Sequence, residues 1–210
     1  MANNIFIKAI VIGFTVAAVV GPIGLLCVQR TLARGWKWGM ASGLGVASGD
    51  ALYGLIGGLG LSLVTNFLVG QQLWLRLIGG GVLIYLGVKA LVSPTPLNAA
   101  EEQAPSTAGY LKAYSSIFLL TLSNPMTIIF FAGIYAGLGE IGIGSGWANA
   151  GMFALGILFG SLAWWVVLVS SVSALRSRFN PHLLSKLNRV SGVIIAGFGV
   201  WIWVSMISGR

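Results

Sequence analysis

Charged residues are scarce in this chain: they make up 8% of its 210 residues, and only four are acidic. The chain also has a single cysteine, Cys27, and a single histidine, His182. One cysteine excludes a dithiol relay, which needs two thiols. One histidine without neighbouring ligands argues against a nickel or cobalt site. We therefore predict no metal, no cofactor and no enzymatic site, because the apolar segments lack the paired carboxylates or histidines that such a site needs.

Hydrophobic residues, in contrast, make up 57% of the chain, and the mean hydropathy is +0.92. A membrane-spanning helix needs roughly 20 apolar residues. Continuous apolar runs without strict alternation favour helices over a transmembrane barrel. We predict an all-α integral membrane protein with six transmembrane helices, at about Ile5 to Val28, Gly39 to Leu63, Leu73 to Val92, Tyr114 to Leu138, Trp147 to Val172 and Val190 to Ile207. The first span is expected to be retained rather than cleaved as a signal peptide.

Lysine and arginine predict the orientation of these spans, because cytoplasmic loops are enriched in both. Nine of the twelve lie in or beside the first, third and fifth loops: Arg30, Arg34, Lys37, Lys89, Lys112, Arg176, Arg178, Lys186 and Arg189. The odd-numbered loops are therefore expected to be cytoplasmic, with both termini periplasmic. The net charge of +8 is then a topology signal rather than a nucleic-acid surface, since the basic residues are not gathered on one folded face.

Two spans are interrupted at matching places, Gly21-Pro22 and Asn124-Pro125, with the prolines 103 residues apart. The third and sixth spans also align, Gly80 and Gly87 with Gly192 and Gly199, at an offset of 112. With three helices per half, the second half enters the membrane upside down. We predict an inverted three-plus-three repeat with helices 1 and 4 broken, divided into residues 1–92, a flexible cytoplasmic linker 93–109, and residues 110–210.

Asp50 is the one acidic residue deep inside a predicted span. It lies about eleven residues into the second span, roughly 17 Å along the helix and near the middle of a hydrocarbon layer of ~30 Å. An ionised carboxyl group there costs about 2.5 to 3.5 kcal/mol, so such groups usually face a cavity. We expect Asp50 to bind a substrate ammonium, a coupling proton or both. The alternative is an aspartate that only ties helices together.

The breaks themselves predict a substrate site. Gly/Pro-interrupted helices at equivalent positions of inverted repeats are where transporters bind substrate and coupling ions. A helix that begins at Pro22 or Pro125 presents free amides and a positive dipole end, which suits a carboxylate. We predict a substrate site at Gly21, Pro22, Asp50, Asn124 and Pro125, supported by Tyr53, Thr121, Ser123 and Thr127. The alternative is a pair of proline kinks repaired by neighbouring helices.

Several of these residues, taken together, resemble the lysine-exporter (LysE/RhtB) family of amino acid efflux carriers. The resemblance runs almost end to end and rests on Gly21-Pro22, Gly35, Gly39, Gly43, Asp50, the stretch Leu75 to Gly87, and Asn124-Pro125. It implies a small bacterial inner-membrane protein that exports amino acids, with efflux driven by the proton gradient. It also implies that both breaks lie in a central cavity, and that Asp50 takes the place of an aspartate present in lysine-type members.

Two residues depart from the family pattern and leave the substrate open. Met126 follows the second break where many members have lysine, and Ile23 follows the first where a small or polar residue is more usual. We expect a secondary transporter that exports a small amino acid or related zwitterion in exchange for protons, without nucleic acid as a partner. Export of another small metabolite or cation, and a non-transporting scaffold role, stay open. A homo-oligomer in the lipid bilayer is equally compatible with the sequence.

Overall fold

The described part of the chain is entirely helical. A computed structural model describes residues 2–19, 21–59, 72–92, 106–124, 127–128, 130–131, 133–134, 146–176 and 181–207. Within these ranges there is no strand, in agreement with the predicted all-α class. The longer helices are α1 (Ala2–Ala18), α2 (Pro22–Arg34), α3 (Trp36–Gly58), α5 (Gln72–Val92), α7 (Thr107–Ser123), α9 (Trp147–Leu175) and α10 (Pro181–Ile207).

These helices match the predicted spans with some shifts. Helices α5 and α9 have nearly the predicted bounds, whereas α10 begins earlier, at Pro181. Two described helices are long and apolar enough to cross a membrane, Trp147–Leu175 and Arg189–Met206. The pair Ile5–Ala18 and Pro22–Arg34 passes the same criterion together, as one segment bent by 77°. The full count of six spans stays a prediction.

The predicted linker of residues 93–109 overlaps the first turn of a helix at its C-terminal end. Helix α7 already begins at Thr107, because the Ser106 side chain accepts a hydrogen bond from the Gly109 amide (3.1 Å) and caps the first turn. Residues 93–105 lie outside the described residues.

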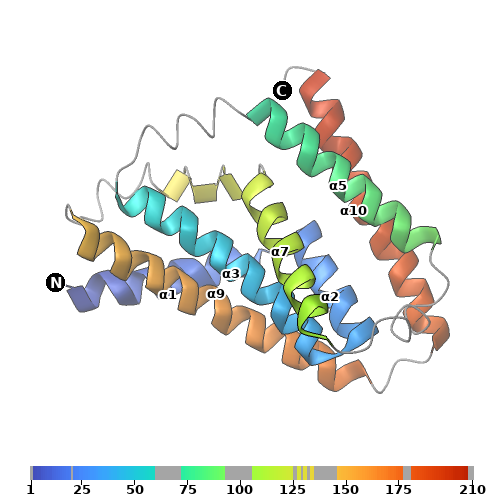
Figure 1. Ribbon diagram of the computed structural model, residues 1–210, viewed down its shortest axis with the longest axis horizontal. Helices are drawn as coiled ribbons and strands as arrows, with labels where there is room; N and C mark the ends of the chain where they lie inside the picture. Colours follow the sequence, from blue (N-terminus) through green and yellow to red (C-terminus); the bar gives the residue numbers. More distant parts are fainter. Residues whose placement is uncertain are drawn as a thin grey trace.

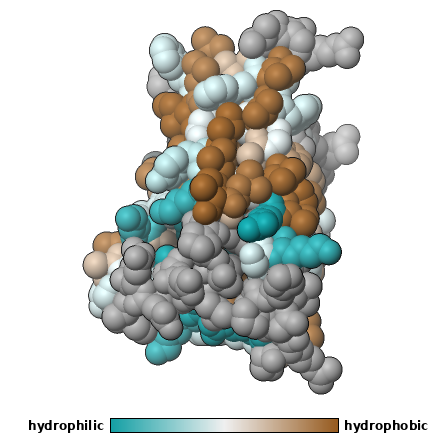
Figure 2. Space-filling view, turned by 90° about the vertical axis from the view of Figure 1, so that its right-hand side faces the viewer, coloured by the Kyte–Doolittle hydropathy of each residue, from teal (hydrophilic) through white to brown (hydrophobic). Residues whose placement is uncertain are grey.

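Large apolar side chains cover the outer surface, as expected for a protein solvated by lipid. Exposed examples come from α1, α5, α7, α9 and α10: Val11, Trp74, Tyr85, Leu119, Phe159, Val193 and Trp201. The face in Figure 2 carries extended apolar areas, with polar side chains gathered in its lower half. The buried positions, in turn, include the polar residues Thr31, Ser42, Asp50, Thr121, Ser161 and Ser191. This distribution is that of a membrane protein with a polar interior.

Helix α3 lies at the centre of the arrangement, between α7 and α9 (Figure 1). Helix α1 packs along the far side of α9, while α5 and α10 form a second pair joined to the rest mainly through α2 and α7. Small residues permit this close packing. A Cβ at Gly45 of α3 would lie 2.5 Å from the Tyr114 carbonyl oxygen and 3.1 Å from the Phe118 amide nitrogen of α7.

The same contact recurs between α1 and α9. A Cβ at Gly156 of α9 would lie 2.7 Å from the Phe6 carbonyl oxygen and 3.3 Å from the Ile10 amide nitrogen of α1. In both pairs the glycine fits against the carbonyl of one residue and the amide of the residue four positions later. Helix α7 therefore packs on α3 in the way that α1 packs on α9.

Contacts within the α3–α9 and α5–α10 pairs are reciprocal. Gly43 lies against Trp165, and Gly54 lies against Ala154. With an offset of 111, position 43 corresponds to 154 and position 54 corresponds to 165. The two contacts are therefore equivalent. Gly80 likewise approaches the carbonyl of Gly199, and Gly87 that of Gly192, with an offset of 112. Mutual contacts of this kind are expected between two units related by a two-fold axis.

We expect Gly45→Ala to lower the thermal denaturation midpoint of the protein in detergent. The new Cβ would meet backbone atoms of α7, which cannot rotate away, and overpacking typically costs about 1 to 3 kcal/mol. That cost exceeds the gain of about 1 kcal/mol that alanine brings to a helix. The matched control is Gly197→Ala, where a Cβ has nothing within 4 Å. A midpoint for Gly45→Ala equal to or above that of Gly197→Ala would contradict the packing described.

Candidate functional site

The first break separates α1 from α2. Helix α1 ends at Ala18 and α2 begins at Pro22, with Gly21 as its extended N-cap residue (φ −107°, ψ −167°). Proline suits the first helical position because no partner is needed there for an amide hydrogen. The Gly21 carbonyl accepts from the Leu25 amide at 3.1 Å. Within the described residues no side chain caps this end of α2, which therefore keeps free amides and a positive dipole end.

The second break follows α7 at Asn124. The Asn124 backbone is extended (φ −78°, ψ 114°), its amide donates to the Thr121 carbonyl (3.3 Å), and its carbonyl accepts from the Ile128 amide (3.1 Å). A new helical turn thus starts at Asn124. Its side-chain Nδ2 donates to Thr127 Oγ1 at 3.0 Å. The predicted site residue Pro125 lies outside the described residues.

Tyr53 of α3 supports the end of α7. Its hydroxyl donates to the Leu122 carbonyl at 2.7 Å, one of the carbonyls that a helix end leaves without an intrahelical partner. The Tyr53 ring stacks on Phe131, with ring centroids 5.3 Å apart. Tyr53 is therefore a residue that holds the second break in place.

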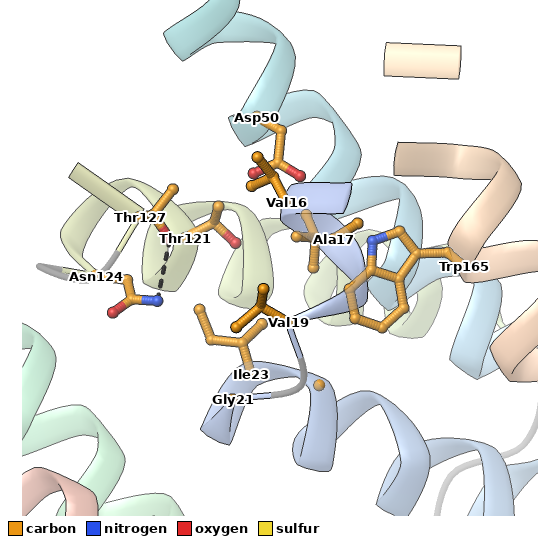
Figure 3. Close-up of a pocket in the computed structure, with 12 residues that line it drawn as sticks. Val16, Ala17, Val19, Gly21, Ile23, Asp50, Thr121, Asn124, Thr127 and Trp165 are labelled. Atoms are coloured by element: carbon orange, nitrogen blue, oxygen red, sulfur yellow. Dashed lines mark hydrogen bonds between the residues drawn. The ribbon is translucent and has the colours of Figure 1, made fainter. Parts of the chain in front are cut away.

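A pocket of about 70 Å³ lies between the two breaks and the centre of α3 (Figure 3). Such a volume has room for several water molecules. The polar side chains on its wall are Asp50, Thr121, Asn124 and Thr127 together with the indole of Trp165, and its remaining lining comprises Val16, Ala17, Val19, Gly21, Ile23, Gly24 and Val46. The fold thus brings both interrupted segments and the buried acid to one cavity.

Asp50 is almost fully buried, with 2% of its surface exposed. Ser161 of α9, itself fully buried, donates a hydrogen bond to Asp50 Oδ2 at 2.8 Å. Sequence reasoning missed Ser161, although a signal was present: Gly49-Asp50 and Gly160-Ser161 are separated by the same 111 residues that relate the contacts of α3 and α9.

Not all predicted site residues reach the pocket. Pro22 is buried at the start of α2, and the pocket wall is formed by its neighbours Gly21 and Ile23. Ser123 lines a smaller neighbouring cavity of about 10 Å³, together with Asn124, and its hydroxyl donates to the Leu119 carbonyl (2.8 Å). Asn124 is therefore shared by both cavities. Trp165, which is not among the predicted site residues, lines the larger one.

The three basic residues expected in the first loop, Arg30, Arg34 and Lys37, all lie in helices instead. Only Gly35, with a positive φ of 89°, separates α2 from α3, and Arg30 belongs to α2. Its guanidinium donates to Ser42 Oγ (3.0 Å), the Ala113 carbonyl (2.8 Å) and Ser116 Oγ (3.0 Å). The loop assignment of Arg30 is thus wrong: its planar guanidinium joins α2 to α3 and α7 through partly buried hydrogen bonds.

Arg176 acts at the C-terminal end of α2. Its Nε donates to the Leu32 carbonyl (2.8 Å) and its Nη2 to the Ala33 carbonyl (3.0 Å). A cation at a helix C-terminus also opposes the negative end of the helix dipole. Arg30 and Arg176 together fix the position of α2, and with it the N-terminal turn that forms part of the pocket.

Comparison with known proteins identifies the family. Residues 14–205 match the model of the family described as LysE type translocator. The chain belongs to this family. Similar proteins include "Putative amino acid efflux protein YcgF" of Bacillus subtilis (strain 168), 31% identical over 201 residues that cover 94% of both chains. "Uncharacterized membrane protein YahN" of Escherichia coli (strain K12) is 29% identical over 175 residues, 82% of this chain and 77% of that protein.

A third relative, "Chemotactic transduction protein ChpE" of Pseudomonas aeruginosa, is 28% identical over 174 residues, 82% of this chain and 84% of that protein. No solved structure matches the chain. The chain is thus a member of a family of membrane translocators, and the family resemblance seen in the sequence is confirmed.

We expect Arg30→Met to destabilise this LysE-family protein markedly. The change leaves the Ala113 carbonyl and two serine hydroxyls without their charged donor, and a hydrogen bond to a charged group is worth about 1.5 to 3 kcal/mol. Arg34→Met is the matched control one turn away, where the guanidinium lies over the Trp38 ring at 4.6 Å in a contact worth about 0.5 to 1 kcal/mol at exposed sites. Thermal denaturation in detergent measures both. Equal midpoints for the two variants would refute the anchoring role of Arg30.

Proposed function

We propose that this chain is a secondary transporter that exports a small amino acid or related zwitterion from the cytoplasm in exchange for protons. One observation carries the proposal: the pocket at Gly21 and Asn124, where two helices are interrupted, also contains the buried carboxyl group of Asp50. Interrupted helices that meet at a polar cavity are the usual substrate sites of transporters built from inverted repeats. The name of the relative "Putative amino acid efflux protein YcgF" supports the same substrate class.

The proposed architecture is an inverted repeat of residues 1–92 and 110–210. Three sets of matching contacts support it. Helix α1 packs on α9 as α7 packs on α3, and the glycine contacts are reciprocal within both α3–α9 and α5–α10. The hydrogen bond between Ser161 and Asp50 then joins equivalent positions of the two halves. In this arrangement the substrate lies close to the pseudo-two-fold axis, where rocking of the halves can expose it to either side.

The two ends of a zwitterion have different partners in the proposed site. The carboxylate would lie at the N-terminal turn of α2, beside Gly21, Pro22 and Ile23, where free amides and the helix dipole favour an anion. The ammonium would bind Asp50, with Asn124 and Pro125 at the second break completing the site. Thr121 and Thr127 supply hydroxyls on the same wall.

Competition for Asp50 would couple export to protons. A lone ionised carboxyl group within the membrane is unfavourable, by about 2.5 to 3.5 kcal/mol. Either a substrate ammonium or a proton removes that cost, but one carboxyl group cannot hold both. Proton binding from the outside would thus release the amino acid, and the protonated carrier would return to the inside.

The contacts of Arg30 and Arg176 suggest which side is closed. Both connect α2 of the first half to helices of the second half, α7 and α9 respectively. With the odd-numbered loops in the cytoplasm and both termini in the periplasm of a bacterial inner membrane, these contacts lie on the cytoplasmic side of the pocket. Opening toward the cytoplasm would then require them to rearrange.

A non-transporting role is the second candidate, favoured by the name of the relative ChpE, a chemotactic transduction protein. A carrier is stabilised by its substrate through mass action, whereas a scaffold without a ligand is not. Thermal denaturation in the presence of amino acids, other small metabolites and cations therefore separates these functions and also identifies the substrate class.

We expect Asp50→Asn to abolish proton-driven export. In liposomes loaded with labelled amino acid, an acidic exterior should accelerate efflux through the wild-type protein. Asparagine cannot exchange a proton, so efflux through the variant should not respond to the gradient. The control for reconstitution and membrane insertion is Ser205→Ala, a change on α10 at a residue that does not line the pocket. Efflux through Asp50→Asn that responds to the gradient as strongly as wild type would exclude the proposed coupling.

A further inference from the structure

One tryptophan on the pocket wall has an indole N–H group without a hydrogen-bond acceptor among the described residues. Trp165 of α9 is 3% exposed, and its Nε1 is buried without a hydrogen-bond partner among the described residues. Buried polar groups are nearly always paired, so each exception calls for a reason. Because Trp165 lines the cavity that contains Asp50, a bound molecule is one acceptor that could complete its hydrogen bonding.

The neighbouring Trp164 shows that an unpaired indole alone is not a site. Its Nε1 is also buried and unpaired within the described residues. Its ring, however, packs edge-on against Phe14, with centroids 5.5 Å apart and planes at 84°, and Trp164 is not part of the pocket wall. Of these two described tryptophans with unpaired indoles, Trp165 alone lines the cavity.

Gly43 lets Trp165 pack closely on α3. A Cβ at Gly43 would lie 2.8 Å from the Cβ and 2.9 Å from the Cγ of Trp165, so the indole lies directly against the backbone of α3. Gly43 and Asp50 are seven residues apart, two turns along the same face of α3. On α9, Ser161 and Trp165 are one turn apart. In Figure 3 the indole nitrogen is on the side of the ring toward Ala17 and Asp50.

An α-amino acid fits this pair of groups. Its ammonium and carboxylate are attached to one carbon atom, so a ligand whose ammonium binds Asp50 carries its carboxylate into the same small cavity. An N–H donor to a carboxylate forms a charge-assisted hydrogen bond, which is about twice as strong as a neutral one. Trp165 and the N-terminal turn of α2 line the same pocket, so one carboxylate bound there would lie near both.

The rest of the wall selects the side chain of that ligand. Val16, Ala17, Ile23 and Val46 are apolar, and Asp50 is the one acid among the lining residues. Once Asp50 holds the α-ammonium, a second positive charge has no acidic partner on the described wall. A volume of about 70 Å³ also favours a short side chain.

Resting on the proposed function, we propose that the Trp165 indole N–H binds the substrate carboxylate, and that the pocket selects amino acids with a small uncharged side chain over cationic ones. Trp165 is thus a specificity-determining residue as well as part of the wall. A purely structural role for the ring would require its shape but not its N–H group.

The test compares Trp165→Phe with the matched control Trp164→Phe. The probes are L-valine and isobutylamine, which is L-valine without its carboxylate, and L-lysine. Apparent affinity is read as the ligand concentration that half-saturates thermal stabilisation of the purified protein. We expect Trp165→Phe to weaken L-valine binding by roughly ten- to a hundredfold, the range expected for a charged hydrogen bond, with little effect on isobutylamine. Trp164→Phe should bind both as wild type does, and wild type should prefer L-valine to L-lysine.

Three results would overturn the inference. Equal losses for L-valine and isobutylamine in Trp165→Phe would assign the ring a structural role. An unchanged L-valine affinity in that variant would exclude the hydrogen bond, while preference of the wild type for L-lysine would exclude the selectivity. In each case the proposed transport function stands, since an amino acid still binds. Binding of no amino acid by the wild type would overturn both proposals.

Discussion

The structure depends on how backbone polar groups are satisfied where helices are interrupted away from water. Breaking a helix leaves amides and carbonyls that lipid cannot pair. Here the carbonyl of Leu122 accepts from Tyr53, that of Asn124 accepts from Ile128, and the carbonyls that end α2 accept from Arg176. The N-terminal turn of α2 has no such side-chain partner within the described residues. The polar groups left at the breaks are thus directed to one cavity, where a ligand can use them.

Helix α3 makes that cavity possible because it carries both small residues at its contacts and a polar residue, Asp50. Gly43 and Gly45 let α9 and α7 approach its backbone closely, so the chain can bury Asp50 among packed helices with Ser161 as its donor. The same close approach brings Trp165 to the wall. Packing and chemistry are therefore linked in this helix: a larger residue at a contact position would move the groups that form the site.

Two partly buried arginines connect α2 to the rest of the protein. Arg30 donates to α3 and α7, and Arg176 reaches α2 from α9. Their acceptors are neutral hydroxyls and carbonyls, so these contacts can be exchanged for water with less cost than a buried ion pair that is split. In the proposed transport cycle these are the contacts of α2 that would rearrange.

Composition and long apolar runs alone indicated an all-α membrane protein, because long apolar segments with few charges are suited to the lipid bilayer. Local patterns located the breaks. Proline favours the first turn of a helix whatever the tertiary contacts of that helix are, so Gly21-Pro22 marked the start of α2. Asp50 was identifiable for the same reason, as the acid that an apolar run should not contain. Tertiary structure alone decided the partners of these residues. Ser161, Trp165 and the acceptors of Arg30 come from helices distant in sequence, and which faces meet depends on the close contacts of glycines on α3 and α9. The loop assignment of Arg30 failed on this point, because a charge pattern records a side of the membrane, whereas burial depends on the hydroxyls and carbonyls that neighbouring helices supply.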